Sequence, residues 1–260
     1  MAFHLLSIIR FNFKFIYKKI FLFLAWTIGI LLFHTLYYTG YSYHSALDVY
    51  LLSIGGVESE QLHLIQMFIV LLPYFGIAII VDVYMTQMMG RQAIYSILRM
   101  KKKVFFIVSH ILSLFLIIVL MLLIYHGSLL FITYSIYDST QLTETLFPWI
   151  SVTNEDVFSE LIFPSFLVQI VGTFCVSCVQ LAVSIHLNRF GSGFIFVVIV
   201  YLLQLAFPFV LGQHTFISNI LKDSSSSILF FIIQFLIIGG SSMYLYLTSK
   251  KNIIIFSERS

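Results

Sequence analysis

The residue types that do chemistry in proteins are sparse in this chain, and its two cysteines form the most suggestive pattern. Cys175 and Cys178 have the Cys-x-x-Cys spacing that is used in redox and metal sites. The same spacing puts both thiols on one face of a helix, among the small residues Gly172 and Ser177, as in closely packed membrane helices. We interpret the pair as part of a helix-packing face, with a redox or metal role as the alternative.

The histidines and acidic residues form no recognisable catalytic or metal-binding pattern. His34, His110 and His126 are scattered over two apolar stretches, and no pair has the spacing of H-E-x-x-H. A membrane protease or lipid-modifying transferase would need a paired base and nucleophile or a metal set, and the apolar stretches contain neither. The phosphate-binding pattern G-x-x-x-x-G-K-[ST] does not occur. The sequence therefore predicts a protein that is not an enzyme and holds no metal or cofactor.

Asp82 is the one acidic residue within the apolar stretches. Such a residue can mark a proton or ion pathway. Because it lies near the end of its stretch, where pairing with Arg91 or water costs little, we expect a structural role, with a proton relay as the alternative. Uncharged polar residues recur along the stretches and could line a path or bond helices together. The glutamines among them are Gln66, Gln169, Gln180, Gln204 and Gln234.

All of these groups must be positioned by helices that cross a membrane. Hydrophobic residues make up 60% of the 260 residues and charged residues 10%, against about 25% charged in soluble domains. Six apolar stretches are each long enough for a helix to cross the hydrocarbon layer. They cover residues 20–39, 62–86, 104–133, 161–187, 190–213 and 228–248. We expect residues 1–260 to form a single all-α integral membrane domain, since the gaps are too short for a separate soluble core.

The basic residues predict the orientation of this domain. Thirteen of the fourteen Lys and Arg residues lie before the first stretch or after the second, fourth and sixth, and the other is Lys222. By the positive-inside rule these segments and both chain ends are cytoplasmic, which predicts a multi-pass protein of the cytoplasmic (plasma) membrane. The net charge of +3 reflects this asymmetry. Basic residues at that face would meet anionic lipid headgroups, so we predict no nucleic-acid partner.

Residues 1–19 are expected to form a helix at the membrane surface. Arg10, Lys14 and Lys18 recur every four residues, on one stripe of a helix, and apolar residues occupy much of the remaining surface. No small-residue cleavage site follows, so we expect this segment to be retained rather than removed as a signal peptide. A plain basic flank that orients the first span is the alternative.

The gap between the second and third stretches, residues 87–103, has the most organised pattern. A Gly-Arg step precedes apolar residues at helical spacing, and a basic cluster then leads directly into the third stretch. This order predicts a short amphipathic helix on the cytoplasmic side, with an ordinary basic loop as the alternative. The residues expected to act here are Gly90, Arg91, Ile94, Tyr95, Ile97, Leu98, Arg99 and Lys101.

Residues 207–227, between the last two stretches, are expected to interrupt the helices. Pro208, Gly212 and a run of serines favour a broken helix or a short re-entrant element. Non-helical backbone at membrane depth has to be covered by protein.

The basic N-terminal helix, the six stretches and the segment after the second one resemble the permease subunits of the type 2 ABC exporter family. The likeness covers the whole chain in architecture and is motif-like over Met85–His110. It implies that residues 1–19 are an elbow helix and that residues 87–103 include a coupling helix, which docks on an ATPase subunit. The chain departs from the family pattern at Thr86, where members often have an acid, and at Arg99-Met100, where they often have Ser-Pro or Thr-Pro.

The resemblance also implies partners. Two separate ABC ATPase subunits would bind ATP and Mg, and a second six-span permease, identical or similar, would complete a homodimer or heterodimer in the membrane lipid. The cargo would be a peptide or an amphipathic or hydrophobic small molecule. Divergent members of this composition resemble bacterial permeases that remove antimicrobial peptides. The alternative is a stand-alone immunity or sensor protein that binds a toxin or signalling partner without transport.

Overall fold

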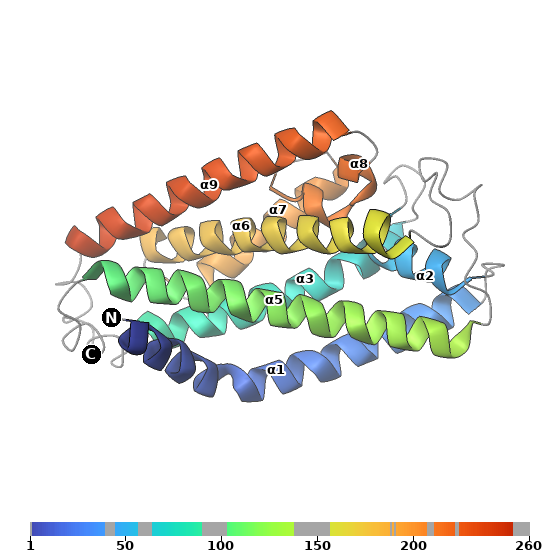
Figure 1. Cartoon of the computed structure of the whole chain (residues 1–260), viewed down its shortest axis with the longest axis horizontal. Coiled ribbons are helices and arrows are strands. Elements are labelled where there is room, and N and C mark those ends of the chain that lie inside the picture. The colour runs from blue at the N-terminus through green and yellow to red at the C-terminus, as the bar shows by residue number, and fades with distance from the viewer. Residues whose placement is uncertain are drawn as a thin grey trace.

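A computed structural model gives the fold of most of the chain. It describes residues 2–39, 45–56, 64–89, 103–137, 157–187, 189, 191–206, 211–221 and 224–251. Within these ranges the chain is all-helical and contains no β-strand. The long helices lie side by side in an elongated bundle, and α1 begins at the same end of the bundle at which α9 ends (Figure 1).

The bundle contains six helices of fifteen residues or more within the described ranges. They are α1 (Ala2–Thr39), α3 (Leu64–Met89), α5 (Lys103–Ile136), α6 (Phe163–Leu187), α7 (Ser192–Ala206) and α9 (Ser224–Lys251). The shorter elements are α2 (Ala46–Ser53), the π-helix η2 (Phe158–Ile162), the 3₁₀ helix η3 (Gln213–Thr215) and α8 (Ser218–Leu221).

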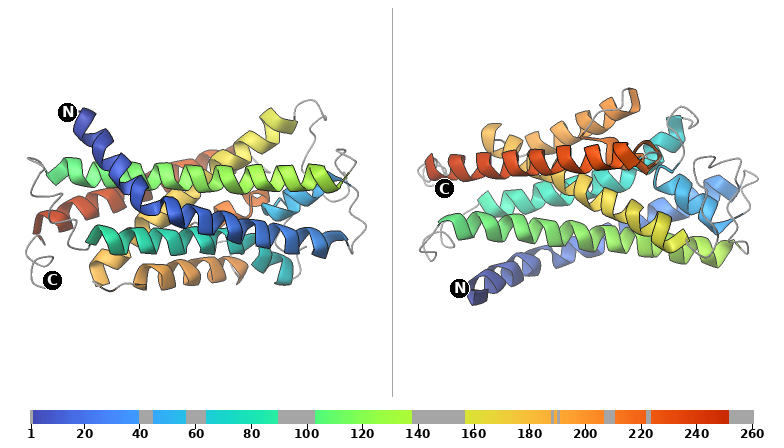
Figure 2. Two further views of the ribbon diagram at one scale, coloured as in Figure 1. Left: turned by 90° about the horizontal axis from the view of Figure 1, so that it is seen from below. Right: turned by 45° about the horizontal axis from the view of Figure 1, so that its top comes forward.

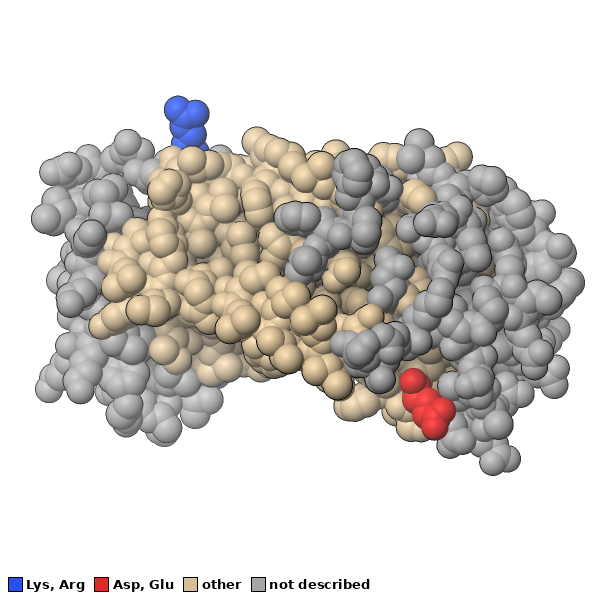
Figure 3. Space-filling view, turned by 90° about the horizontal axis from the view of Figure 1, so that it is seen from above, with Lys and Arg blue, Asp and Glu red and all other residues tan. Residues whose placement is uncertain are grey.

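Five helical segments are long and apolar enough to cross a membrane. They are Ile16–Phe33, Ile65–Met85, Ile107–Ile136, Phe158–Leu187 and Ser226–Thr248. The length and composition of these helices identify the chain as a multi-pass membrane protein. The face shown in Figure 3 agrees, because a broad belt of uncharged residues separates the described acidic and basic side chains.

The predicted fifth stretch, residues 190–213, differs in the structure. Its helix α7 has 15 residues, or about 22 Å, which is short of the ~30 Å of the hydrocarbon layer. The helix ends two residues before Pro208, and the residue preceding a proline disfavours helical backbone. A turn, η3 and α8 follow over residues 211–221. The broken element expected in residues 207–227 is thus confirmed over residues 211–221. The expectation was wrong for the serine run 224–227, which is helical and begins α9. Six complete crossings stay a prediction.

Helix α1 runs without interruption through the boundary predicted at residue 19, and it bends within its first half (Figure 2). Arg10, Lys14 and Lys18 are all exposed on it. The opposite face buries Asn12 and Ile16 against the bundle. The first half of α1 is therefore amphipathic, as its sequence predicts, and whether it lies in a membrane surface stays a prediction.

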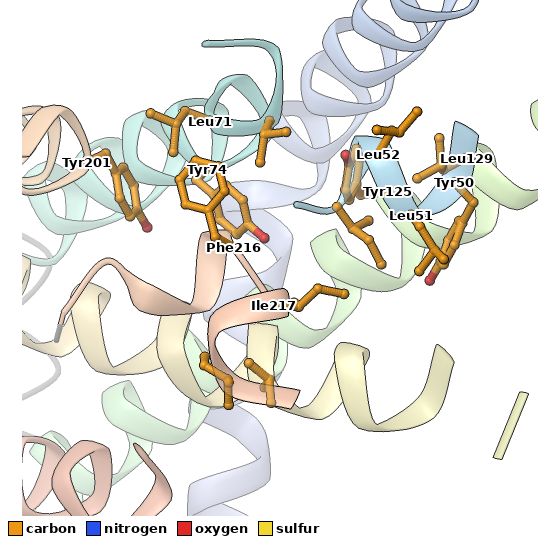
Figure 4. Packing of buried hydrophobic residues seen from close by; sticks show 14 of the residues in the cluster. Tyr50, Leu51, Leu52, Leu71, Tyr74, Tyr125, Leu129, Tyr201, Phe216 and Ile217 are labelled. Carbon is orange, nitrogen blue, oxygen red and sulfur yellow. The ribbon is translucent and has the colours of Figure 1, made fainter. Parts of the chain in front are cut away.

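The core is concentrated where short elements enter the bundle. All eight residues of α2 are buried, although α2 lies in a gap between two predicted spans. Its Tyr50, Leu51 and Leu52 pack in one cluster with Tyr74 of α3 and Phe216 of the segment after η3 (Figure 4). Two gap segments far apart in the sequence therefore fold into the same end of the bundle.

Candidate functional site

The C-terminal turn of α2 is held by donors from three other elements. A helix leaves its last carbonyl groups without intrahelical partners, and inside a membrane bundle those partners must come from the protein. The carbonyl of Ser53 accepts from the hydroxyl of Tyr125 at 3.0 Å, and that of Ile54 accepts from Nε2 of Gln169 at 3.4 Å. The carbonyl of Gly55 accepts from the backbone N–H of Ser218 at 3.3 Å. This turn is thereby bonded to α5, α6 and α8.

A buried relay of side chains continues from this turn. The hydroxyl of Tyr50 lies 2.7 Å from Nδ1 of His126, and Nε2 of His126 lies 2.6 Å from Oε1 of Gln169. Gln169 uses its Nε2 to donate to Ile54, so its Oε1 must accept from an N–H of His126. Burial raises the pKa of Tyr50 well above its ordinary value, so its hydroxyl keeps a proton to donate. The hydrogen bonds therefore assign the proton of a neutral His126 to Nε2.

Two glycines allow α2, α6 and η3 to approach one another. Gly55 has a φ of 74°, and a Cβ added to it would overlap the carbonyl oxygen of Thr215. A Cβ added to Gly172 would overlap the side chain of His214. Larger residues at either position would push the 211–221 segment out of the bundle. The close packing therefore requires glycine at both positions.

His214 belongs to η3, within this segment, and is fully buried. Its Nε2 lies 3.3 Å from the hydroxyl of Tyr201, and its ring packs edge-on against Tyr74 with ring centroids 5.2 Å apart. Burial lowers the pKa of His214 to about 3. The ring is therefore neutral at physiological pH.

A second buried polar cluster anchors the first half of α1 near the other end of the bundle. Nδ2 of Asn12 lies 2.9 Å from Oγ of Ser113 and 3.2 Å from both the hydroxyl of Tyr84 and Nδ1 of His110. The Tyr84 hydroxyl itself lies 2.8 Å from Nδ1 of His110. Asn12 thus ties α1 to α3 and α5 on the face opposite its exposed basic residues.

Asp82 of α3 caps helix α7. Its carboxylate accepts hydrogen bonds from the backbone N–H groups of Gly191 and Phe194, at the end of α7 where the helix dipole favours negative charge. One turn earlier on α3, the carbonyl of Ala78 accepts from Nε2 of Gln180 at 2.9 Å. The partners of Asp82 are backbone groups that sequence pattern alone did not indicate. This contact supports the expected structural role, and the choice between that role and a proton relay stays a prediction.

The structure brings together only some of the residues singled out in the sequence. Cys175 and Cys178 are buried free thiols on α6. Among the described residues, no three His, Cys, Asp or Glu side chains are grouped as a metal site would require. The residues of the predicted coupling helix, Gly90, Arg91, Ile94, Tyr95, Ile97, Leu98, Arg99 and Lys101, lie outside the described residues.

Sequence reasoning missed α2 altogether. Its sequence does carry one start signal, because Ser45 is followed three residues later by Asp48 and then by an apolar run. In the structure the Ser45 side chain accepts from the backbone N–H of Asp48 at 3.0 Å. Tyr50 and its bond to His126 could have been found only through that helix.

Comparison with protein-family models, curated proteins and solved structures gives no match to this chain. The likeness to the type 2 ABC exporters therefore stays a prediction from the sequence pattern.

Proposed function

We propose that this chain is the membrane-spanning permease subunit of an ATP-driven exporter of the type 2 ABC kind. Two separate ATPase subunits bind ATP and Mg and act on the segment between α3 and α5. A second permease, identical or similar, completes the complex. The cargo is a peptide or an amphipathic or hydrophobic small molecule, carried out of the cytoplasm of a bacterial cell.

The observation that carries this proposal is the pattern of residues 90–103. This link joins two helices of membrane-crossing length, α3 and α5, and combines an apolar helical turn with five basic residues. A docking helix needs both features, because apolar side chains supply contact area and the basic residues hold the link at the cytoplasmic face. The first half of α1 is expected on the same, cytoplasmic side, because its exposed residues include Arg10, Lys14 and Lys18.

The test is the recovery of partners from native membranes. The tagged chain is purified in mild detergent, and proteins in stoichiometric amount are identified by mass spectrometry. We expect an ATPase with a phosphate-binding loop. The variant Ile97→Asp/Leu98→Asp should insert normally and lose this ATPase, because two carboxylates replace apolar contacts.

The matched control is Gln92→Asp/Ser96→Asp, which adds the same charge to the opposite face of the expected helix. It should retain the ATPase. Retention of the ATPase by the Ile97/Leu98 variant would refute the coupling-helix assignment. Recovery of the chain without any ATPase, in several detergents, would favour a stand-alone immunity or sensor protein instead.

A further inference from the structure

Helix α6 has a stripe of uncharged polar side chains that runs along most of its length. The stripe consists of Gln169, Thr173, Ser177, Gln180 and Ser184, at spacings of four, four, three and four residues. On an α-helix these positions fall within about 80° of one face and extend over about 22 Å. All five side chains are buried, with at most 4% of their surface exposed. A polar stripe of this length lies inside the bundle, although α6 crosses an apolar medium.

The contacts of the stripe show that it faces other helices and not lipid. Near one end, Gln169 bonds to His126 of α5 and to the turn after α2. Farther along, Gln180 donates to the carbonyl of Ala78 on α3. At the other end, Ser184 lies so close to α7 that a Cβ added to Gly193 would overlap its Oγ. The stripe therefore lies in the interior, between α5, α3 and α7.

Three atoms of the stripe have unused hydrogen-bonding capacity. Oγ1 of Thr173, Oε1 of Gln180 and Oγ of Ser184 are buried and have no hydrogen-bond partner among the residues that the structure describes. Burying such groups without partners is unfavourable, and it is more so in a bundle surrounded by lipid. Gln180 and Ser184 are one helical turn apart, so their side chains lie on the same face of α6.

We propose that ordered water binds along this stripe, with one molecule bridging Oε1 of Gln180 and Oγ of Ser184 and another at Thr173. Water supplies what these atoms lack, because it donates to an amide oxygen and both donates to and accepts from a hydroxyl. Buried waters typically occupy such sites and make about three hydrogen bonds each.

A bound cation fits this site less well. Ser184 faces the first turn of α7, whose N-terminal dipole is positive. The carboxylate of Asp82, which could neutralise a cation, already accepts from the N–H groups of Gly191 and Phe194 in that turn. Asp82, which contacts the same turn of α7, is only partly buried.

The test compares the melting temperatures of paired variants of the full chain in detergent. Thr173→Val and Ser184→Ala each remove a hydroxyl that is expected to bind water. Thr133→Val and Ser165→Ala are their controls, because these buried hydroxyls already donate to carbonyls in their own helices, those of Leu129 and Leu161. If water is bound, each test variant should melt about 2–4 °C below wild type, and its control should change less.

A change of the melting temperature in the opposite direction would overturn the proposal. If the site is dry, removing an unpaired buried hydroxyl relieves its desolvation, and the test variants melt at or above the wild-type temperature. A wild-type melting temperature that falls when sodium is replaced by choline, with no such change in Ser184→Ala, would show a cation in place of water. In a high-resolution density map of the purified protein, we expect a solvent peak within hydrogen-bond distance of both Gln180 and Ser184, and its absence counts against the bridge.

Discussion

The turn after α2 provides a direct test of how the two inserted segments meet. Gly55 has a φ of 74°, a conformation that strains any residue with a Cβ. A Cβ at this position would also overlap the carbonyl oxygen of Thr215 and come within 2.9 Å of Cα of Phe216. Gly55→Ala therefore introduces two costs, one local and one that exists only if the 211–221 segment lies against the turn.

The magnitude follows from these two costs. Left-handed backbone destabilises a non-glycine residue by about 1–2 kcal/mol. Forcing a methyl group against packed backbone adds about 1–3 kcal/mol. The middle of the combined range is about 3.5 kcal/mol, which corresponds to a fall in melting temperature of about 7–14 °C for a chain of this size. The measurement is thermal unfolding of the purified protein in detergent, followed by intrinsic fluorescence and by loss of the monodisperse peak in size-exclusion chromatography.

Gly191→Ala is the matched control. Gly191 has a similar φ of 81°, but a Cβ there would meet no atom within 4 Å. Its substitution should cost only the backbone strain, about 1–2 kcal/mol. The difference between the two variants measures the contact of the α2 turn with Thr215. Equal losses of stability in the two variants would refute the packing of these segments.

Two further predictions concern the polar groups of the same region. Gln169→Leu should lower the melting temperature, because it leaves the Nε2–H of His126 and the carbonyl of Ile54 without the partner seen here. Each buried group that loses its partner lowers the free energy of unfolding by about 1–3 kcal/mol. An unchanged melting temperature would contradict the relay. For His214, the folded pKa of about 3 lies below the ordinary value of 6.5. As the pH falls, His214 of the unfolded chain therefore takes up a proton first. Between pH 7.5 and 5.5 this difference alone lowers the free energy of unfolding by about 1.4 kcal/mol. His214→Asn should remove that share of the pH dependence of the melting temperature, and identical pH profiles for variant and wild type would show that His214 is not buried as a neutral ring.

The composition and hydrophobic pattern were sufficient for the general architecture. Helical secondary structure is required in lipid because every backbone polar group must find a partner within its own segment. Stretches such as residues 104–133 could therefore be assigned to helices from length and apolar content, and the structure places all of residues 104–133 in α5 (Lys103–Ile136). Pro208 and Gly212 predicted the interruption near the last two helices for a similarly local reason, since proline restricts the backbone before it. The exposed basic stripe of α1 also followed from spacing alone.

The polar contacts inside the bundle depend on the tertiary structure. Helix α2 has eight residues, too few to be recognised as a crossing helix, and its burial is possible only because Tyr125, Gln169 and Ser218 bring donors to its last carbonyls. Asp82 meets the start of α7 for the same reason, since its partners lie more than a hundred positions later in the sequence. A one-dimensional pattern gives the face of a helix on which a polar residue lies. Which group it meets there is decided when segments distant in the sequence pack together, because a hydrogen bond requires both partners within about 3 Å.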